Sequence, residues 1–347
     1  MRKVLYGFLC ASFMAGSAAA AGPAGQLLDL SKLEHATTAP DAPVVYYSRQ
    51  ITPEAMLKLY AALGRPATGK VAVKLSTGEA GNNHYLSPAL IAPLVKSING
   101  TIVECNTAYG GSRADTQSHR KVIKDHGFDA IAPVDIMDEE GSMSIPVKQG
   151  QYLKEDLVGS HLANYNFMAV LSHFKGHAMG GFGGALKNIS IGVASSQGKH
   201  LIHSAGHTTE NAWTYQDGAY ATYTSPEKLE SPQQLEFIKS MAEAAKAVSD
   251  YEGEGQRMLY ISVLNHLSVD CDCNGNPAAP DMHDIGIIAS TDAVAIDQAG
   301  VDLVWLAPDS GSLKQRMDSR HGRDILEYAQ SLGLGKTNYR IVDIDAQ

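Results

Sequence analysis

The stretch that decides the fold covers residues 167–192 and reads FMAVLSHFKGHAMGGFGGALKNISIG. Its first five residues form an apolar run with the length of a buried strand. A turn that contains five glycines follows, and helix-forming residues occupy positions 185–193. A strand, a glycine-rich turn and a helix start are typical of α/β proteins, which place reactive side chains and backbone N–H groups at the carboxyl end of a strand. We therefore expect this loop to form the floor of a functional site.

Three other apolar segments end in the same way, each in a loop rich in Gly, Asn, His or Cys. These loops cover residues 76–84, 105–113 and 265–273, and predicted helices separate most of the strands. Right-handed crossovers between such strands give a parallel sheet, which brings all four loops to one edge. The sequence thus predicts an α/β protein with a mainly parallel, Rossmann-like sheet flanked by helices. It forms one large domain or two closely packed lobes.

The amino-terminal residues have the pattern of an export signal. Arg2 and Lys3 precede an apolar stretch at residues 4–14, and small residues follow at 17–21. We expect a cleaved signal peptide over residues 1–21, an extended lead-in over 22–43 and the α/β domain over 44–347, in a periplasmic or secreted protein. The apolar stretch is shorter than the roughly 20 residues of a membrane span, so no span is predicted.

The charge of the chain excludes some partners. The net charge is −9, which argues against a nucleic acid or an anionic membrane surface. No cluster of basic residues stands out in this acidic sequence. The sequence predicts a small-molecule ligand and indicates no particular protein partner.

The number and spacing of the cysteines limit the kinds of site that the chain can form. Three cysteines remain beyond the predicted signal peptide, namely Cys105, Cys271 and Cys273. This number and the chain length exclude a small disulfide-built scaffold. The last two flank a single residue, and three interpretations are open for them: a strained local disulfide, two core or surface thiols, or a pair of metal ligands.

Two histidines in the central loop are candidate partners of these cysteines. His173 and His177 are four residues apart, a spacing that many metal sites use, although the surrounding glycines indicate a turn and not a helix. Together with Cys271 and Cys273 they would make a tetrahedral site with two imidazoles and two thiolates. Such a site suits one transition metal ion, Zn or Fe.

The glycine turn itself allows two interpretations. Its backbone could cradle an anion whose charge Lys175 or Lys187 counters, or it could be a tight chain reversal where backbones pack closely. The turn matches neither of the common phosphate-binding and dinucleotide-binding glycine patterns. Our catalytic candidates are Lys187, Asn188 and His119, and our ligand-binding candidates are Lys175, Gly180, Gly181, Gly183, Gly184 and Arg113.

These segments together resemble a bacterial and archaeal family known as domain of unknown function 362. The matching stretches are His119 and HGF at 126–128, SHFKGHAMGGFGGALKNISIG at 172–192, GK at 198–199, DCDC at 270–273 and IGIIASTDAVAIDQAGVDLV at 285–304. Many members of the family carry a ferredoxin-like insertion with two iron–sulfur clusters. Since this chain has no cysteine between residues 193 and 258, no such clusters are expected here. The family also resembles the amino-terminal part of nickel-pincer lactate racemases in fold.

The convergence of these loops predicts a metal-dependent exported enzyme that acts on a small polar or anionic metabolite. One alternative is a non-catalytic periplasmic protein that binds a metal or another ligand. The other is a thiol redox protein in which Cys271 and Cys273 form a reversible disulfide.

Overall fold

A computed structural model describes residues 28–212 and 232–346 of the chain. The predicted signal peptide, residues 1–21, and the first part of the predicted lead-in lie outside the described residues. The rest of the lead-in contains a short 3-10 helix, Leu30–Lys32, and pairs through Ala36 with Tyr339 in an isolated β-bridge.

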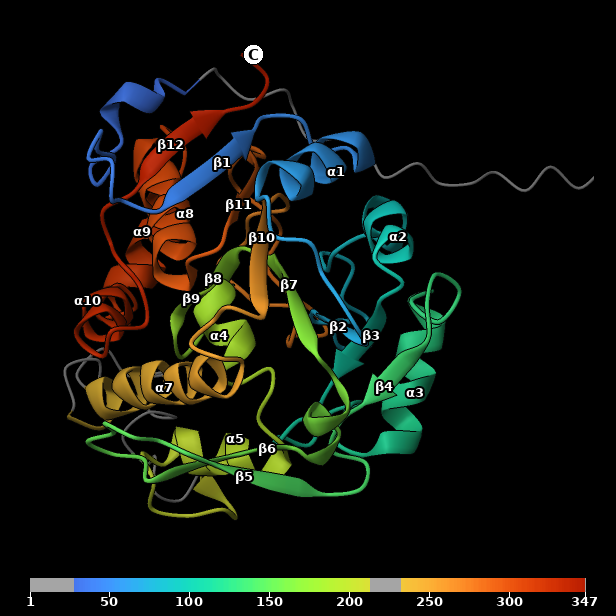
Figure 1. Cartoon of the computed structure of the whole chain (residues 1–347). Coiled ribbons are helices and arrows are strands. Elements are labelled where there is room, and N and C mark those ends of the chain that lie inside the picture. The colour runs from blue at the N-terminus through green and yellow to red at the C-terminus, as the bar shows by residue number, and fades with distance from the viewer. Residues whose placement is uncertain (1–27, 213–231, 347) are drawn as a thin grey trace, which may run out of the picture.

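One eight-stranded sheet forms the centre of the fold, in the order β12-β1-β11-β10-β7-β2-β3-β4 (Figure 1). All its strands except β11 run parallel to one another, so the predicted mainly parallel α/β sheet is confirmed. The strands are β1 (Val44–Ser48), β2 (Val71–Lys74), β3 (Thr101–Glu104), β4 (Val134–Ile136), β7 (Phe167–His173), β10 (Met258–Leu264), β11 (Gly286–Ser290) and β12 (Arg340–Asp343).

The reversed direction of β11 has a simple cause. No helix lies between β10 and β11 in the chain, and the two strands are neighbours in the sheet. A parallel pair needs a crossover that returns the chain to the starting edge, whereas neighbouring strands joined without one pair antiparallel. The loop between β10 and β11 carries Cys271 and Cys273, so it begins at the edge where the parallel strands end.

Helices cover both faces of the sheet, which explains why its central strands are buried throughout. In β2, Val71 and Val73 pack in the core beneath α1, α2 and α3, and Ala72 packs in the opposite core with α4, α7 and α8 (Figure 1). The helices are α1 (Pro53–Ala62), α2 (Pro88–Ser97), α3 (Thr116–Asp125), α4 (Ala185–Ile189), α5 (Ser196–His203), α7 (Pro232–Tyr251), α8 (Ala293–Leu306), α9 (Gly311–Asp318) and α10 (Asp324–Ser331), with a second 3-10 helix at Ser160–Asn164.

Local sequence signals explain where the helices begin and end. Thr52 caps α1 by accepting a hydrogen bond from the Ala55 N–H, and Asp292 caps α8 in the same way. Helix α4 is shorter than the helix predicted over residues 185–193. The Ser190 hydroxyl donates to the Leu186 carbonyl at 2.8 Å, a local bond that competes with continuation of the helix.

Two small ribbons complete the architecture. One pairs β5 (Ser142–Pro146) with β6 (Glu155–Gly159), and the other pairs β8 (Lys175–His177) with β9 (Gly181–Gly183). The second ribbon occupies part of the predicted glycine turn. A Cβ atom on Gly176 would lie 2.3 Å from the Val269 carbonyl oxygen, so glycine lets this ribbon approach the loop after β10. In the part of the chain that the structure describes, no helix has the length and apolarity to span a membrane.

Candidate functional site

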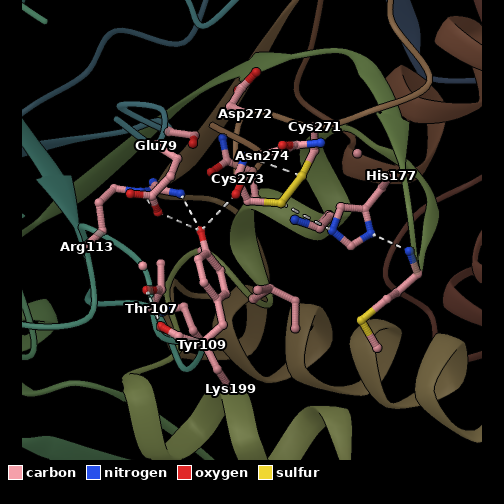
Figure 2. A pocket seen from close by; sticks show the side chains of 18 of the residues that line it. Glu79, Thr107, Tyr109, Arg113, His177, Lys199, Cys271, Asp272, Cys273 and Asn274 are labelled. Carbon is pink, nitrogen blue, oxygen red and sulfur yellow. Dashed lines mark hydrogen bonds and ion pairs between the residues drawn. A yellow bond between two sulfur atoms is a disulfide. The ribbon is translucent and has the colours of Figure 1, made fainter. Parts of the chain in front are cut away.

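A cavity of about 560 Å³ lies at the carboxyl ends of β10, β7, β2 and β3, which are consecutive in the sheet. Each of the four polar loops contributes to its lining, as the sequence predicts. Glu79 comes from the first loop, Tyr109 and Arg113 from the second, His177 from the third and Cys273 from the fourth (Figure 2). The structure therefore brings residues separated by almost 200 positions to one crevice.

Direct hydrogen bonds hold these loops together. The Glu79 N–H donates to the Asp272 carbonyl oxygen at 2.7 Å, and the Asn82 amide donates to the Asn274 carbonyl oxygen at 2.8 Å. On the other side of the same loop, the Gly176 N–H donates to the Ser268 carbonyl oxygen at 2.7 Å. The loop that carries the two cysteines is thus held between the loops that follow β2 and β7.

A buried ionic cluster forms one wall of the cavity. The Glu104 carboxylate lies 3.0 Å from Lys74 Nζ and 3.3 Å from Arg113 Nη1, and it also accepts the Thr77 N–H at 2.8 Å. Burial opposes ionisation of Glu104, yet the charges of Lys74 and Arg113 lower its pKa to about 2. Sequence reasoning did not select Lys74 or Glu104. The available signal was a lysine inside a buried-type strand and a glutamate at the end of the next strand.

Arg113, a predicted ligand-binding residue, is also engaged with other side chains. Its Nη2 atom donates to the Tyr109 hydroxyl at 3.0 Å, and its Nε atom lies 3.5 Å from the Glu79 carboxylate. Tyr109 in turn donates to Glu79 at 3.2 Å (Figure 2). Arg113 therefore holds the second loop against the first, with its charge close to two carboxylates.

Lys187 has a different environment. It lines the cavity from α4, and no hydrogen bond or ion pair joins its amine to any residue that the structure describes. Burial and, to a smaller extent, the nearby charge of Lys175 lower the pKa of Lys187 to about 7, against the opposing effect of Asp272. A lysine with this pKa carries a substantial fraction of neutral amine at neutral pH.

Asn188, the next predicted catalytic residue, is tied to the sheet. Its amide donates to the Leu171 carbonyl oxygen and to the Ser172 hydroxyl, both at 3.0 Å. It lines the cavity beside Lys187. These bonds make Asn188 a link between α4 and the end of β7.

His173 lies on the cavity wall with both ring nitrogens in use. Nδ1 is 2.8 Å from the Asp272 carboxylate, and Nε2 is 2.7 Å from the Asn265 carbonyl oxygen. These two contacts occupy both ring nitrogens, so neither nitrogen is available to a metal ion in this arrangement. Lys175 lies 2.7 Å from the other oxygen of Asp272. Burial opposes ionisation of Asp272, but Lys175 and His173 hold its pKa well below the usual range.

Cys271 and Cys273 are joined by a disulfide that lines the cavity, which is the first of the three interpretations left open above. The His177 ring stands next to it, with Nε2 at 3.9 Å from the Cys273 sulfur (Figure 2). Nδ1 of His177 accepts the Gly180 N–H at 2.8 Å and the Met179 N–H at 3.2 Å. Because a backbone N–H can only donate, the hydrogen of this neutral ring resides on Nε2. Burial, followed by the charge of Lys187, holds the pKa of His177 well below its usual value.

Within the described ranges, three groups of side chains have the composition and spacing to hold a metal ion. They are His177, Cys271 and Cys273; Glu34, His35 and Asp302; and Asp135, Glu139 and His161. The first group differs from the four ligands that the sequence predicts, because His173 is engaged elsewhere. As arranged, its sulfurs are in a disulfide and its imidazole presents a hydrogen. Zinc and iron bind thiolates and imidazole lone pairs, so this group fits a metal ion only after reduction and loss of that hydrogen.

The remaining predicted residues divide between the cavity and the surrounding packing. Gly183 and Gly184 line the cavity, whereas Gly181 packs against Gly322, where a Cβ atom would come within 2.8 Å of the Gly322 Cα atom. Gly180 donates its N–H to His177. His119 is fully buried outside the cavity lining, 3.2 Å from the Asn106 amide oxygen, and burial lowers its pKa to about 4. Because His119 is not among the lining residues, its catalytic role stays a prediction.

Gly184→Ala is expected to lower the free energy of unfolding by about 2 kcal/mol, because two hydrogen bonds to the buried Asp297 carboxyl group are lost. An added Cβ atom would lie 2.2 Å from Asp297 Oδ1. This buried carboxylate accepts the Ala185 N–H at 2.7 Å and the Leu186 N–H at 2.9 Å, which fixes the start of α4. Urea unfolding measures the effect.

Gly110→Ala is the matched control. Gly110 also lines the cavity, but an added Cβ atom there meets nothing within 4 Å. We expect it to change the free energy of unfolding by less than about 0.5 kcal/mol. Equal stabilities of the two variants would contradict the role that we assign to Asp297.

The fold and the cavity define an α/β protein with a ligand-sized crevice at the carboxyl edge of its sheet. Residues 71–302 match the model of a family described as Domain of unknown function (DUF362). The chain belongs to this family.

Two solved structures are similar to parts of the chain. One is the lactate racemase apoprotein from Thermoanaerobacterium thermosaccharolyticum, at 15% identity and a TM-score of 0.38, with 64% of this chain and 50% of that chain covered. The other is a protein from Thermotoga maritima, at 11% identity and a TM-score of 0.36, with 78% and 58% covered. The chain thus spans only half or somewhat more of the length of these proteins. No curated protein matches it.

Proposed function

We propose that this protein is an enzyme that binds a small organic anion in the cavity and uses Lys187 to transfer a proton to or from it. The observation that supports the proposal is the Lys187 amine, which faces the cavity with no acidic partner in the described part of the chain. An amine whose pKa is about 7 can donate and accept a proton at neutral pH. The cavity is also of the size that small-molecule sites have.

The charges around the cavity favour an anionic ligand. Its lining holds five cationic side chains, Lys74, Arg113, Lys175, Lys187 and Lys199, and four carboxylates, Glu79, Glu104, Asp270 and Asp272. Every one of these carboxylates lies in an ion pair. An incoming carboxylate would therefore stabilise the protonated, positively charged form of Lys187.

Two further parts of the proposal rest on the sequence. We propose export, on the basis of residues 1–21, and a disulfide is compatible with an oxidising compartment. We also propose that a transition metal ion binds one of the three candidate groups. Elemental analysis of protein purified without a tag tests the metal, and a content well below one ion per chain would remove it from the proposal.

Lys187→Met is expected to weaken the binding of small mono- and dicarboxylates by about tenfold or more, because it removes a charged partner from a buried site. Lys187→Arg should keep part of the affinity, since it keeps the charge. Thermal shift and calorimetry with a panel of carboxylates measure this. Lys58→Met is the control, because Lys58 is an exposed residue of α1.

The pH dependence of binding gives an independent check. Above pH 7 the Lys187 amine loses its charge, so the affinity for the anion should fall as the pH rises, with proton uptake on binding near pH 7. Proton transfer itself is seen as incorporation of solvent deuterium into the bound anion by NMR. Binding without such exchange would support the non-catalytic alternative, and affinity unchanged in Lys187→Met would exclude this site.

A further inference from the structure

We propose that the Cys271–Cys273 disulfide exchanges with small thiols that carry a negative charge, and that His177 is the positioning residue for the Cys273 sulfur. The disulfide lines the cavity at the junction of two loops. The reaction needs an accessible sulfur, a stabilised leaving sulfur and a group that holds the released thiolate. The structure contains all three.

The two cysteines differ in exposure. The Cys271 side chain belongs to a residue that is only 5% exposed, whereas Cys273 is half-buried and faces the cavity. An incoming thiolate therefore reaches Cys273 first. The departing Cys271 sulfur already accepts the Cys273 N–H at 3.3 Å, and this donor would stabilise a thiolate.

His177 supplies the donor for the other sulfur. The Gly180 N–H occupies Nδ1, so the ring hydrogen stays on Nε2, which lies 3.9 Å from the Cys273 sulfur. Gly180 packs closely against the ring, since an added Cβ atom would lie 3.3 Å from His177 Nδ1. The ribbon β8–β9 thus fixes both the position and the tautomer of His177. A metal ligand needs a lone pair at Nε2, whereas this nitrogen carries the hydrogen.

The exchange balances as two displacements. A thiolate RS⁻ attacks the Cys273 sulfur, which forms an RS–Cys273 bond, breaks the Cys271–Cys273 bond and releases Cys271 as a thiolate. A second RS⁻ attacks the sulfur of the bound R group, which forms RSSR and releases the Cys273 thiolate next to His177 Nε2. The two protons that the thiols lose end on the two cysteines or in solvent. The two thiols together lose two electrons, and the protein disulfide gains them.

The lining of the cavity selects the thiol. Lys175 in β8 and Lys187 in α4 both line the cavity, and Lys175 Nζ lies 2.7 Å from the carboxylate of Asp272, the residue between the two cysteines. A thiol with a carboxylate is therefore favoured over a neutral or cationic one. This choice of substrate class rests on the same cationic lining as the proposed function. The exchange itself does not, because it needs neither Lys187 nor a metabolite.

The experiment compares three probe thiols on the full protein in its oxidised state, namely 3-mercaptopropionate, 2-mercaptoethanol and cysteamine. Released cysteines are trapped with an alkylating agent and counted by mass spectrometry. After correction for thiolate fraction, we expect the carboxylated thiol to react on the order of tenfold faster than the neutral one and the cationic thiol to react slowest. Equal rates for the three probes, or no reduction before unfolding, would overturn the proposal.

Variants of His177 separate positioning from folding. We expect the reduced wild type to show a thiolate absorbance near 240 nm at neutral pH. His177→Ala should lose this absorbance, and His177→Gln should restore part of it, because Gln again presents an N–H. Unchanged absorbance in His177→Ala would refute the positioning role. Lys187→Met distinguishes the two proposals, since it should weaken carboxylate binding by about tenfold or more and still show this absorbance. Cys105 is buried and unpaired, so Cys105→Ala provides the background correction for alkylation.

Discussion

Replacing Glu104 by glutamine is expected to lower the free energy of unfolding by about 3–5 kcal/mol at pH 7, because it leaves the buried charge of Lys74 without its partner and removes one of the two carboxylates beside Arg113. The carboxylate lies 3.0 Å from Lys74 Nζ and 3.3 Å from Arg113 Nη1. Lys74 is 1% exposed and Arg113 is 4% exposed, so water cannot replace the lost charge. Glutamine keeps the shape of the side chain, so the lost stability comes from the missing charge and not from an empty space in the core.

The effect has a defined pH window. The pKa of Glu104 is about 2 in the folded chain, below its ordinary value of 4.5, so its contribution is complete above pH 4.5 and is lost as the pH falls toward 2. Urea unfolding at pH 7 and near pH 3 measures this, with the exposed Glu54→Gln in α1 as control. A wild-type advantage of the same size at both pH values would contradict the ionic origin of the stabilisation.

Much of the fold can be predicted from residue patterns because those patterns act over short distances. Apolar runs with the length of strands, and caps such as Thr52 before Pro53, locate the central strands and the first helices to within a residue or two. The parallel order of β10, β7, β2 and β3 follows from the helices between most of them. The direction of β11 was not predicted, because it depends on the absence of a crossover helix after β10.

The site could be predicted only in part. Its four loops follow from the topology, but the partner of each side chain depends on contacts across about 100 residues that no local pattern specifies. His173 illustrates this: its two acceptors, Asp272 and the Asn265 carbonyl, are both far from it in the chain. His177 is a different case, because a nearby residue decides which of its nitrogens carries the hydrogen: the N–H of Gly180 donates to Nδ1. The glycine-rich sequence does not reveal this contact. The residue types alone indicate that these histidines bind a metal ion. In the structure, His173 instead donates a hydrogen bond to the Asp272 carboxylate, and His177 points its N–H at the Cys273 sulfur.

The second large effect concerns Asp156, which lies in β6 outside the cavity lining. The residue is fully buried, and both of its carboxylate oxygens lack a hydrogen-bond partner among the described residues. Burial raises the pKa of Asp156 to about 7 from its ordinary 3.8, with Lys199 among the opposing influences. The folded chain thus holds a neutral acid that the unfolded chain ionises at pH 4 and above. The resulting stability is complete below pH 3.8 and is lost as the pH rises toward 7.

Asp156→Asn keeps the shape and removes this dependence on pH. We expect the variant and the wild type to have similar free energies of unfolding near pH 4, and the variant to be more stable by on the order of 4 kcal/mol at pH 8. Urea unfolding across this range measures the difference, and subtraction of the two curves cancels every other titrating group. Asp129→Asn, at an exposed position, should show no such trend. A variant whose advantage does not grow between pH 4 and pH 8 would mean that Asp156 is ionised in the folded chain, with a cation or water as its partner.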